Sequence, residues 1–414
     1  MWKIRDYTRP MDAHQRGKIL AQALDRELRE NILPFWYQTM DHRRGGFAGL
    51  VTFDGKPDMT APKGLVMHSR HLWASSRAWS DRRNPLDLAA ARHAYTYLTG
   101  KLQDRIGRGF WWTVDVRGNP ETESKVLYGQ AFAVYGLAQY YRSTGEAAAL
   151  DLALEVFGLL ESVGRDREFG GYYEAVDRHW KGPLVQALSD VDIPCSKSMN
   201  TNLHILEAYT ALYLATGQAK VAEALESLLQ VFEKHILVSP SHLGLYFDRD
   251  WKNLTEQVSY GHDVEASWLM AEAAQALADH GSHPGHLDPV RAEVCLAIAR
   301  TSLTILKENG GSMPEGIHNG RLDTTRTWWV QAEALVGMVN AWELSGDEAF
   351  LTAAESLWAY IDRFVVDRNR GDWHWAVDAQ GRPDATRPKG GLWKTSYHNG
   401  RACMEVISRV SRWS

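Results

Sequence analysis

The feature of this chain that most constrains its fold is a short motif that recurs six times. In each copy, glycine is followed by aromatic residues and then, a few positions later, by aspartate or asparagine with glycine. Copies lie roughly 60 to 75 residues apart, which is typical of folds built from repeated supersecondary units. The alternating pattern with its terminal turn predicts a small β-hairpin or extended loop. The copies are GGFAGLVTFDG from Gly45, GRGFWWTVDVRG from Gly107, FGGYYEAVDRHW from Phe169 and, less closely, LGLYFDRDW from Leu243, GGSMPEGIHNG from Gly310 and GDWHWAVDAQG from Gly371.

Two helical patterns separate successive motifs. The one before each motif is amphipathic, as in residues 149–161, where apolar residues recur near the spacing i, i+3, i+4, i+7. The one after each motif has fewer charges and more Ala, Leu and aromatic residues, which indicates a helix buried on most sides. We predict outer helices at residues 15–37, 86–102, 147–163, 219–236, 287–306 and 348–366, and inner helices at residues 63–79, 125–141, 199–215, 262–277, 327–342 and 397–410.

Six outer–inner pairs predict an all-α protein, a closed (α/α)6 barrel with short β-hairpins or loops at one end. Closure gives every inner helix two inner neighbours, so no apolar helix face is left exposed. By length alone, 414 residues could form two or three domains. A closed ring of repeats overrides that estimate, and we expect one catalytic domain over residues 1–414.

Composition excludes several functions. A net charge of -5 offers no basic surface for nucleic acid or an anionic membrane. No apolar run approaches the ~18 residues of a spanning helix, and the first ten residues lack the apolar region of a signal peptide. Three separated cysteines without a CxxC pair fit a reducing compartment, so we expect a cytoplasmic protein without disulfides or a zinc site. No GxGxxG or Walker loop precedes a predicted helix, so we expect no nucleotide cofactor.

The aromatic content is unusually high, with 17 Trp and 16 Tyr. A core rich in large side chains would account for it. A sugar site would also account for it, because the apolar faces of pyranose rings stack on flat indoles. Composition alone leaves both interpretations open.

Polar and aromatic residues gather at the starts of the predicted inner helices. If these helices run in the same direction, their N-terminal ends meet at one mouth of the barrel. A single histidine on a buried helix is more often a hydrogen-bonded core residue than a base, but histidines at similar positions of several repeats favour a shared site. The residues at these ends are His68, Arg70, Tyr128, Gln130, Asn200, His204, His262, Glu265, Trp328, Trp329, Glu333, Trp393 and His398.

A helix N-terminus also suits a histidine base. Its partial positive charge disfavours imidazolium, and a neutral imidazole can act as a general base near pH 7. Glu265 lies three residues after His262 on the same helical face. It could orient the histidine ring, bind sugar hydroxyls or simply complement the helix dipole.

Five segments carry a family resemblance: KGLVMHSRHLW from Lys63, KSMNTNLHILEAY from Lys197, SYGHDVEASWL from Ser259, DTTRTWWVQAEALVG from Asp323 and WKTSYHNGRACME from Trp393. With them the chain resembles the N-acylglucosamine 2-epimerase superfamily, and within it the cellobiose 2-epimerases, from about residue 28 to residue 410. The resemblance implies the same barrel and a cofactor-independent inversion of C2 in a reducing-end aldose. It implies catalytic roles for His204, His262 and His398, and substrate binding by Arg70, Tyr128, Asn200, Glu265, Glu315, Trp329, Glu333 and Trp393.

The chain departs from the family pattern at three places. Asn202 stands where many relatives have a further histidine, and Pro314 stands where a tyrosine is expected. LWKTSYHN replaces a more usual phenylalanine- and glycine-containing string around Trp393. The resemblance implies that the last two regions contact the second sugar of a disaccharide, so a disaccharide and a free monosaccharide both remain open as substrates.

We predict a cis-enediolate mechanism in which His262 and His398 are the acid–base pair and Arg70 and His204 stabilise the intermediate. The expected reaction converts cellobiose to glucosyl-mannose, with a small saccharide as the binding partner and a monomer or homodimer as the assembly. Alternatives are a mannose 2-epimerase, an aldose–ketose isomerase, a non-catalytic sugar-binding protein, and a glycoside hydrolase using Glu265 and Glu333 as its two carboxylates. A metal enzyme is disfavoured, because the HxxHxxH run from His280 lies in a Gly/Pro loop and lacks the i, i+4 spacing of a helical zinc site.

Overall fold

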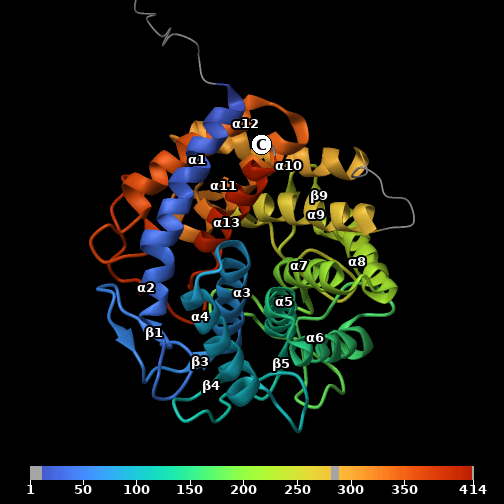
Figure 1. Ribbon diagram of the computed structural model, residues 1–414. Helices are drawn as coiled ribbons and strands as arrows, with labels where there is room; N and C mark the ends of the chain where they lie inside the picture. The colour runs from blue at the N-terminus through green and yellow to red at the C-terminus, as the bar shows by residue number, and fades with distance from the viewer. Residues whose placement is uncertain (1–11, 281–288, 413–414) are drawn as a thin grey trace, which may run out of the picture.

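The computed structural model describes residues 12–280 and 289–412, and over these residues twelve helical segments alternate between an inner and an outer ring (Figure 1). Each inner helix packs on the next, and α13 contacts α3, which closes the ring. The predicted (α/α)6 barrel is therefore confirmed. The inner helices are α3 (Leu65–Arg82), α5 (Leu127–Thr144), α7 (Met199–Thr216), α9 (Tyr260–His280), α11 (Trp328–Ser345) and α13 (His398–Ser411).

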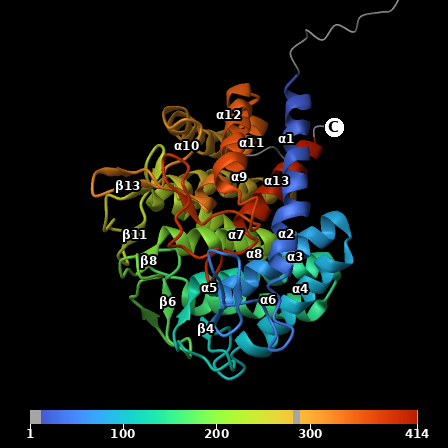
Figure 2. The ribbon, with the colours of Figure 1, turned by 90° about the vertical axis from the view of Figure 1, so that its left-hand side faces the viewer.

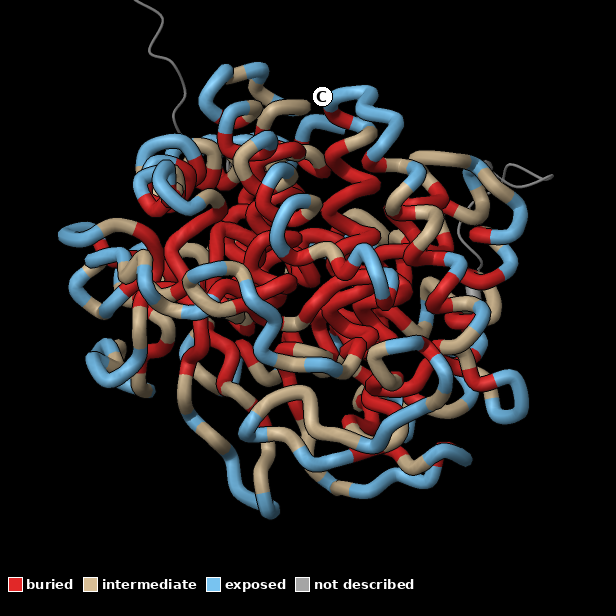
Figure 3. The backbone as a smooth tube through the Cα atoms, turned by 90° about the horizontal axis from the view of Figure 1, so that it is seen from below, coloured by how far each residue is buried: buried red, intermediate tan, exposed pale blue. Residues whose placement is uncertain are grey.

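The outer helices pack around the inner ring. Figure 3 shows buried residues gathered at the centre, with exposed segments around them. The predicted start of the fifth outer helix at residue 287 lies outside the described residues, as do His283 and His286. Most outer helices end in a wider π-helical turn, which the sequence pattern does not reveal. The outer segments are α1 (Ala13–Glu27) with η1 (Leu28–Ile32) and α2 (Leu33–Tyr37), α4 (Pro85–Tyr97) with η2 (Leu98–Leu102), α6 (Ala147–Leu159) with η3 (Leu160–Gly164), α8 (Ala219–Val231) with η4 (Phe232–Ile236), α10 (Pro289–Glu308), and α12 (Glu348–Tyr360) with η5 (Ile361–Val365).

The connection from an inner to an outer helix is short, and the connection from an outer to an inner helix is long. This difference determines at which end of the barrel the motifs lie. Four inner helices, α3, α5, α7 and α11, end in a left-handed residue, such as Gly145 at φ 76° or Gly217 at φ 63°, and an outer helix follows almost at once. The connection from outer to inner helix is long and contains the repeated motif. All motifs and all N-terminal ends of the inner helices therefore lie at the same end of the barrel.

Short antiparallel strand pairs at that end join each repeat to the next, and Figure 2 shows several of them along one side of the molecule. The prediction of hairpins is correct for three motifs, which form β1 (Leu50–Val51) with β2 (Pro57–Asp58), β6 (Ala175–Val176) with β7 (Pro183–Leu184), and β13 (Gly316–His318) with β14 (Arg321–Asp323). A further hairpin, β9 (Leu237–Ser239) with β10 (His242–Leu243), precedes the fourth motif. A bridge between Val51 and Gly390 links the last repeat to the first. The pairs between repeats are β3 (Lys63–Gly64) with β4 (Thr113–Val114), β5 (Lys125–Val126) with β6, β8 (Lys197–Ser198) with β11 (Tyr246–Phe247), β12 (Val258–Ser259) with β13, and β15 (Arg326–Thr327) with β16 (Ala376–Val377).

His68 and Gln130 hold motif loops rather than facing the site, so the expectation that they belong to it is wrong. His68 Nε2 accepts a hydrogen bond from the backbone N–H of Phe47 at 3.1 Å, and Gln130 Oε1 accepts one from Phe110 at 2.9 Å. Asn202, Asp263 and Gln331 accept the corresponding bonds from Tyr172, Leu243 and Met313. Asn202 can stand where many relatives have a histidine, because this position needs only a hydrogen-bond acceptor. In the first repeat, His68 is the acceptor at the same position.

No helix among the residues that the structure describes is both long enough and apolar enough to span a bilayer.

Candidate active site

The N-terminal ends of the inner helices bring the predicted histidines together with buried carboxylates and cations. His398 begins α13, and its Nδ1 lies 2.6 Å from Glu333 Oε1 on α11. Burial, together with the positive charges of Arg70 and Arg401, holds the pKa of His398 well below its usual range. Burial raises the pKa of Glu333, but its carboxylate also accepts hydrogen bonds from Arg401 and Trp268, which favour the ionised form. An ionised carboxylate only accepts hydrogen bonds, so Nδ1 carries the proton, and Nε2 of the neutral ring is left as the basic nitrogen.

His204 on α7 has the same arrangement. Its Nδ1 lies 2.8 Å from Glu207 Oε2, and Glu207 also accepts hydrogen bonds from Tyr397 and Arg401. Burial acts to raise the pKa of Glu207, but the charge of Arg401 and the bond from His204 outweigh it, and the pKa falls to about 2. Glu207 is therefore a carboxylate at neutral pH.

His262 on α9 is oriented differently from the prediction. Its Nδ1 lies 2.8 Å from the hydroxyl of Ser259, and burial lowers its pKa to about 3. Glu265 instead accepts a bond of 2.6 Å from Arg401. Burial and the neighbouring Glu333 raise the pKa of Glu265 to about 7. The suggestion that Glu265 orients the ring of His262 is therefore wrong.

Arg70 connects the first, second and last repeats. Its guanidinium lies 4.5 Å from the ring centre of Phe132 and donates to the hydroxyl of Tyr128 at 2.9 Å. It also donates to the backbone carbonyl of Trp393. The ring of Tyr128 is in turn 4.9 Å from that of His204. Arg70, Tyr128, His204 and Trp393 thus form one continuous group, as the sequence predicts.

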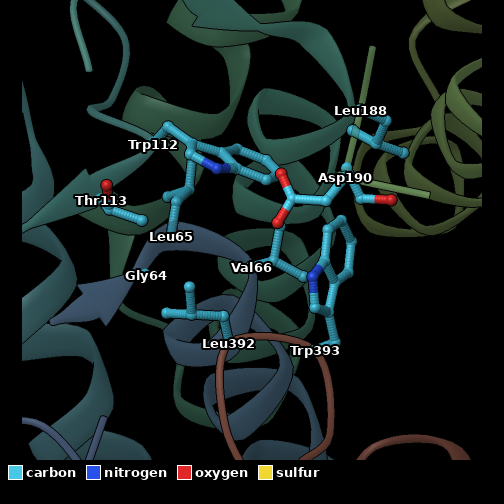
Figure 4. Close-up of a pocket in the computed structure, with 10 residues that line it drawn as sticks. Gly64, Leu65, Val66, Trp112, Thr113, Leu188, Asp190, Leu392 and Trp393 are labelled. Atoms are coloured by element: carbon cyan, nitrogen blue, oxygen red, sulfur yellow. The ribbon is translucent and has the colours of Figure 1, made fainter. Parts of the chain in front are cut away.

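The two predicted sugar-stacking indoles occupy different parts of the site. Trp329 lies against both acid–base candidates, with its ring 4.7 Å from that of His262 and 5.8 Å from that of His398. Trp393 lies 5.7 Å from Trp112 and borders a cavity of about 220 Å³. Figure 4 shows the carboxylate of Asp190 pointing toward the gap between Trp112 and Trp393. Trp112 and Asp190 were not among the sequence candidates.

Asn200 and Glu315 lie at the edge of this group. Asn200 and His262 line the same small cavity, and the amide oxygen of Asn200 is buried with no hydrogen-bond partner among the described residues. Glu315 accepts a bond from Thr327 at the start of α11, while its backbone carbonyl accepts one from Tyr260 at the start of α9. Burial raises the pKa of Glu315 to about 7.

A metal could in principle be held by Glu265, Glu333 and His398, whose ligand atoms lie within 4.8 Å of one another. The guanidinium of Arg401, however, donates to both carboxylates and already supplies their counter-charge. The donor set therefore suits an arginine better than a divalent cation, and metal-free catalysis stays a prediction.

Besides Trp112 and Asp190, the sequence candidates missed Arg401, Glu207, Tyr397 and Ser259. A signal was present for two of them. Glu207 follows His204 by three residues, and Arg401 follows His398 by three, so each pair lies on one helical face.

Comparison with known proteins assigns the barrel and its histidine site to a family of sugar epimerases. The profile of the N-acylglucosamine 2-epimerase (GlcNAc 2-epimerase) family matches residues 45–402, and the chain belongs to this family. Within it, the chain is 40% identical over 395 residues to a cellobiose 2-epimerase of Dictyoglomus turgidum, covering 95% of this chain and 99% of that protein. The solved structure of cellobiose 2-epimerase from Spirochaeta thermophila superposes with a TM-score of 0.92 at 44% identity, over 98% of this chain and 100% of that one. A D-mannose isomerase of Thermobifida fusca is more distant, at 26% identity over 85% of each chain.

Proposed function

We propose that this protein epimerises cellobiose at C2 of its reducing-end sugar, giving glucosyl-mannose. The observation that carries the proposal is the pair His262 and His398, two buried histidines from different helices with lowered pKa values, both against the indole of Trp329. An epimerase needs acid–base groups on both faces of C2, and this pair can supply them. The similarity to cellobiose 2-epimerases supports the same reaction.

The reaction begins with opening of the reducing-end ring, which exposes an aldehyde at C1 and makes the C2 proton acidic. Nε2 of one histidine removes that proton. The electron pair of the C–H bond forms the C1–C2 double bond of a cis-enediolate, and Arg70 stabilises the negative charge on oxygen. His204 does not share this role, because its proton lies on Nδ1 toward Glu207 and its Nε2 has none to donate. The other histidine takes up a proton from solvent as this charge develops and delivers it to the opposite face of C2. The first histidine returns its proton to solvent, so the protons balance over one turnover.

The cavity beside Trp393 favours a disaccharide over a monosaccharide. If the reacting sugar lies against Trp329, the second ring extends toward Trp393 and Trp112, where Asp190 can accept hydrogen bonds from sugar hydroxyls. A free monosaccharide would leave this outer space empty. We further propose a single catalytic domain that acts in the cytoplasm without metal or cofactor.

The experiment that tests the proposal is separate incubation with cellobiose, mannose and glucose, followed by resolution of the products. Glucosyl-mannose from cellobiose is the expected result. Glucosyl-fructose would identify an aldose–ketose isomerase, free glucose would identify a hydrolase, and turnover of mannose or glucose alone would move the assignment to a monosaccharide epimerase or isomerase.

A further inference from the structure

Arg401 lies at the centre of the buried charges of the site. Its side chain is 1% exposed, and it contacts three glutamates, each from a different inner helix. Nη1 donates to Glu207, and Nη2 donates to Glu265 at 2.6 Å and Glu333 at 2.8 Å. The guanidinium also lies 4.3 Å from the ring centre of Tyr397. One side chain therefore connects α7, α9, α11 and α13.

Two of these glutamates are the partners of histidines. Glu207 bonds Nδ1 of His204 through one oxygen while its other oxygen receives Arg401. Oε1 of Glu333 is shared between Nδ1 of His398 and Nη2 of Arg401. Arg401 thus couples two His–Glu pairs that stand on different helices. His262 is outside this network, because its Nδ1 faces the hydroxyl of Ser259.

We propose that Arg401 is a positioning residue that keeps both His204 and His398 in the tautomer protonated at Nδ1. This inference rests on the proposed function for its catalytic meaning. A planar guanidinium can donate to carboxylates on two sides at once, which a single ammonium cannot do in the same geometry.

The physical reason is the charge balance of the cluster. Three carboxylates share one buried cation, and without it they repel one another in a site that disfavours charge. Glu265, whose pKa is already raised to about 7, takes up the first proton, and uptake by Glu333 or Glu207 relieves the repulsion that remains. A neutral carboxyl group donates its proton, so it would bond to Nδ1 as an acceptor and force the histidine proton onto Nε2. If His398 is protonated there, it cannot remove a proton from C2.

The test uses nitrogen-15 NMR of histidine-labelled protein, which distinguishes the two neutral tautomers and the imidazolium. Signals are assigned with His204→Gln, His262→Gln and His398→Gln. In the unmodified protein, His204 and His398 are expected to be protonated at Nδ1. In Arg401→Met, both should shift toward the Nε2–H or charged form while His262 stays unchanged. The kcat for cellobiose should fall about 10²- to 10⁴-fold, the range for losing a correctly positioned acid–base group, with KM changed much less.

Arg409 provides a matched control on the same helix. It is also buried, and it donates to Glu343 at 2.6 Å and to Asn340 at 3.0 Å, two turns beyond Arg401. Arg409→Met should lower stability but leave the histidine tautomers and kcat unchanged. Arg401→Lys keeps the charge and serves if Arg401→Met does not fold. It should disturb at least one of the two histidines and lower kcat less than methionine does.

Wild-type tautomers at both His204 and His398 in a folded Arg401 variant would overturn the inference. An equal response of His262, or the same response in Arg409→Met, would also overturn it. The NMR result does not depend on turnover. A wild-type protein that shows the predicted tautomers but does not epimerise would therefore contradict the proposed function alone.

Discussion

Replacement of Trp393 by alanine tests whether the outer cavity binds a second sugar. The indole lies 5.7 Å from both Tyr128 and Trp112 and forms one side of the cavity of about 220 Å³. The backbone carbonyl of residue 393 is held by Arg70, and alanine keeps that bond. The substitution therefore removes the stacking surface and leaves the anchor of this segment in place.

The expected magnitude follows from the surface lost. A pyranose face on an indole removes on the order of 100 Å² of apolar surface from water, counting both partners, which is worth about 2.5 kcal/mol at about 25 cal/mol per Å². Since every 1.4 kcal/mol is about tenfold in affinity, KM for cellobiose should rise about 10- to 100-fold. KM for a monosaccharide, if one is turned over, should change about threefold or less on the same scale.

Steady-state kinetics with both substrates provide the assay, and Trp329→Ala is the matched control. Trp329 contacts His262 and His398, so its loss should impair both substrates alike. If Trp393→Ala changes KM for the two substrates equally, the second sugar does not stack on this indole and the reasoning about substrate length is wrong.

Three further predictions concern the histidines and the absence of a metal. His262→Ala and His398→Ala should each lower epimerase kcat about 10²- to 10⁴-fold in folded protein, and near wild-type rates in both would show that the histidines are structural. The pKa of His262 lies at about 3 in the folded protein and near 6.5 when unfolded, so the unfolded chain binds more protons between these values and stability falls as pH drops through that window. The free energy of unfolding, measured with denaturant, should therefore fall between pH 7 and pH 5 by about 2 kcal/mol more in the wild type than in His262→Gln. An equal fall in both proteins would contradict the neutral, buried histidine. Incubation with EDTA should leave the rate unchanged, whereas a loss restored by a divalent cation would place a metal among Glu265, Glu333 and His398.

The architecture was predictable because its signal is periodic in the sequence. Six motifs with two helical patterns between them are enough to indicate a closed ring, since each inner helix needs a partner on both sides. The predicted starts of the inner helices agree with the structure within a few residues, and the residues at these ends do meet. The strand pairing was not predictable in the same way. Most motif strands pair with a strand of the neighbouring repeat, and this pairing depends on how the two repeats pack against each other.

The partners of individual polar side chains were harder to predict. Glu265 shares a helical face with His262, yet it turns to Arg401, because a buried carboxylate gains more from a cation on a facing helix than from a neutral imidazole. His68 has the residue type of a base, but it occupies the same position in its repeat as Gln130 and Asn202. All three side chains accept a hydrogen bond from a backbone N–H group. Both outcomes depend on tertiary contacts that spacing along one helix does not contain.

The central claim is that two histidines exchange the C2 proton with solvent on opposite faces, and turnover of cellobiose in heavy water tests it most directly. NMR of the product should show glucosyl-mannose with deuterium at C2, at a rate that matches epimerisation. Glucosyl-mannose formed without deuterium would contradict the solvent-exchanging histidine pair, because it would require the original hydrogen to return to C2.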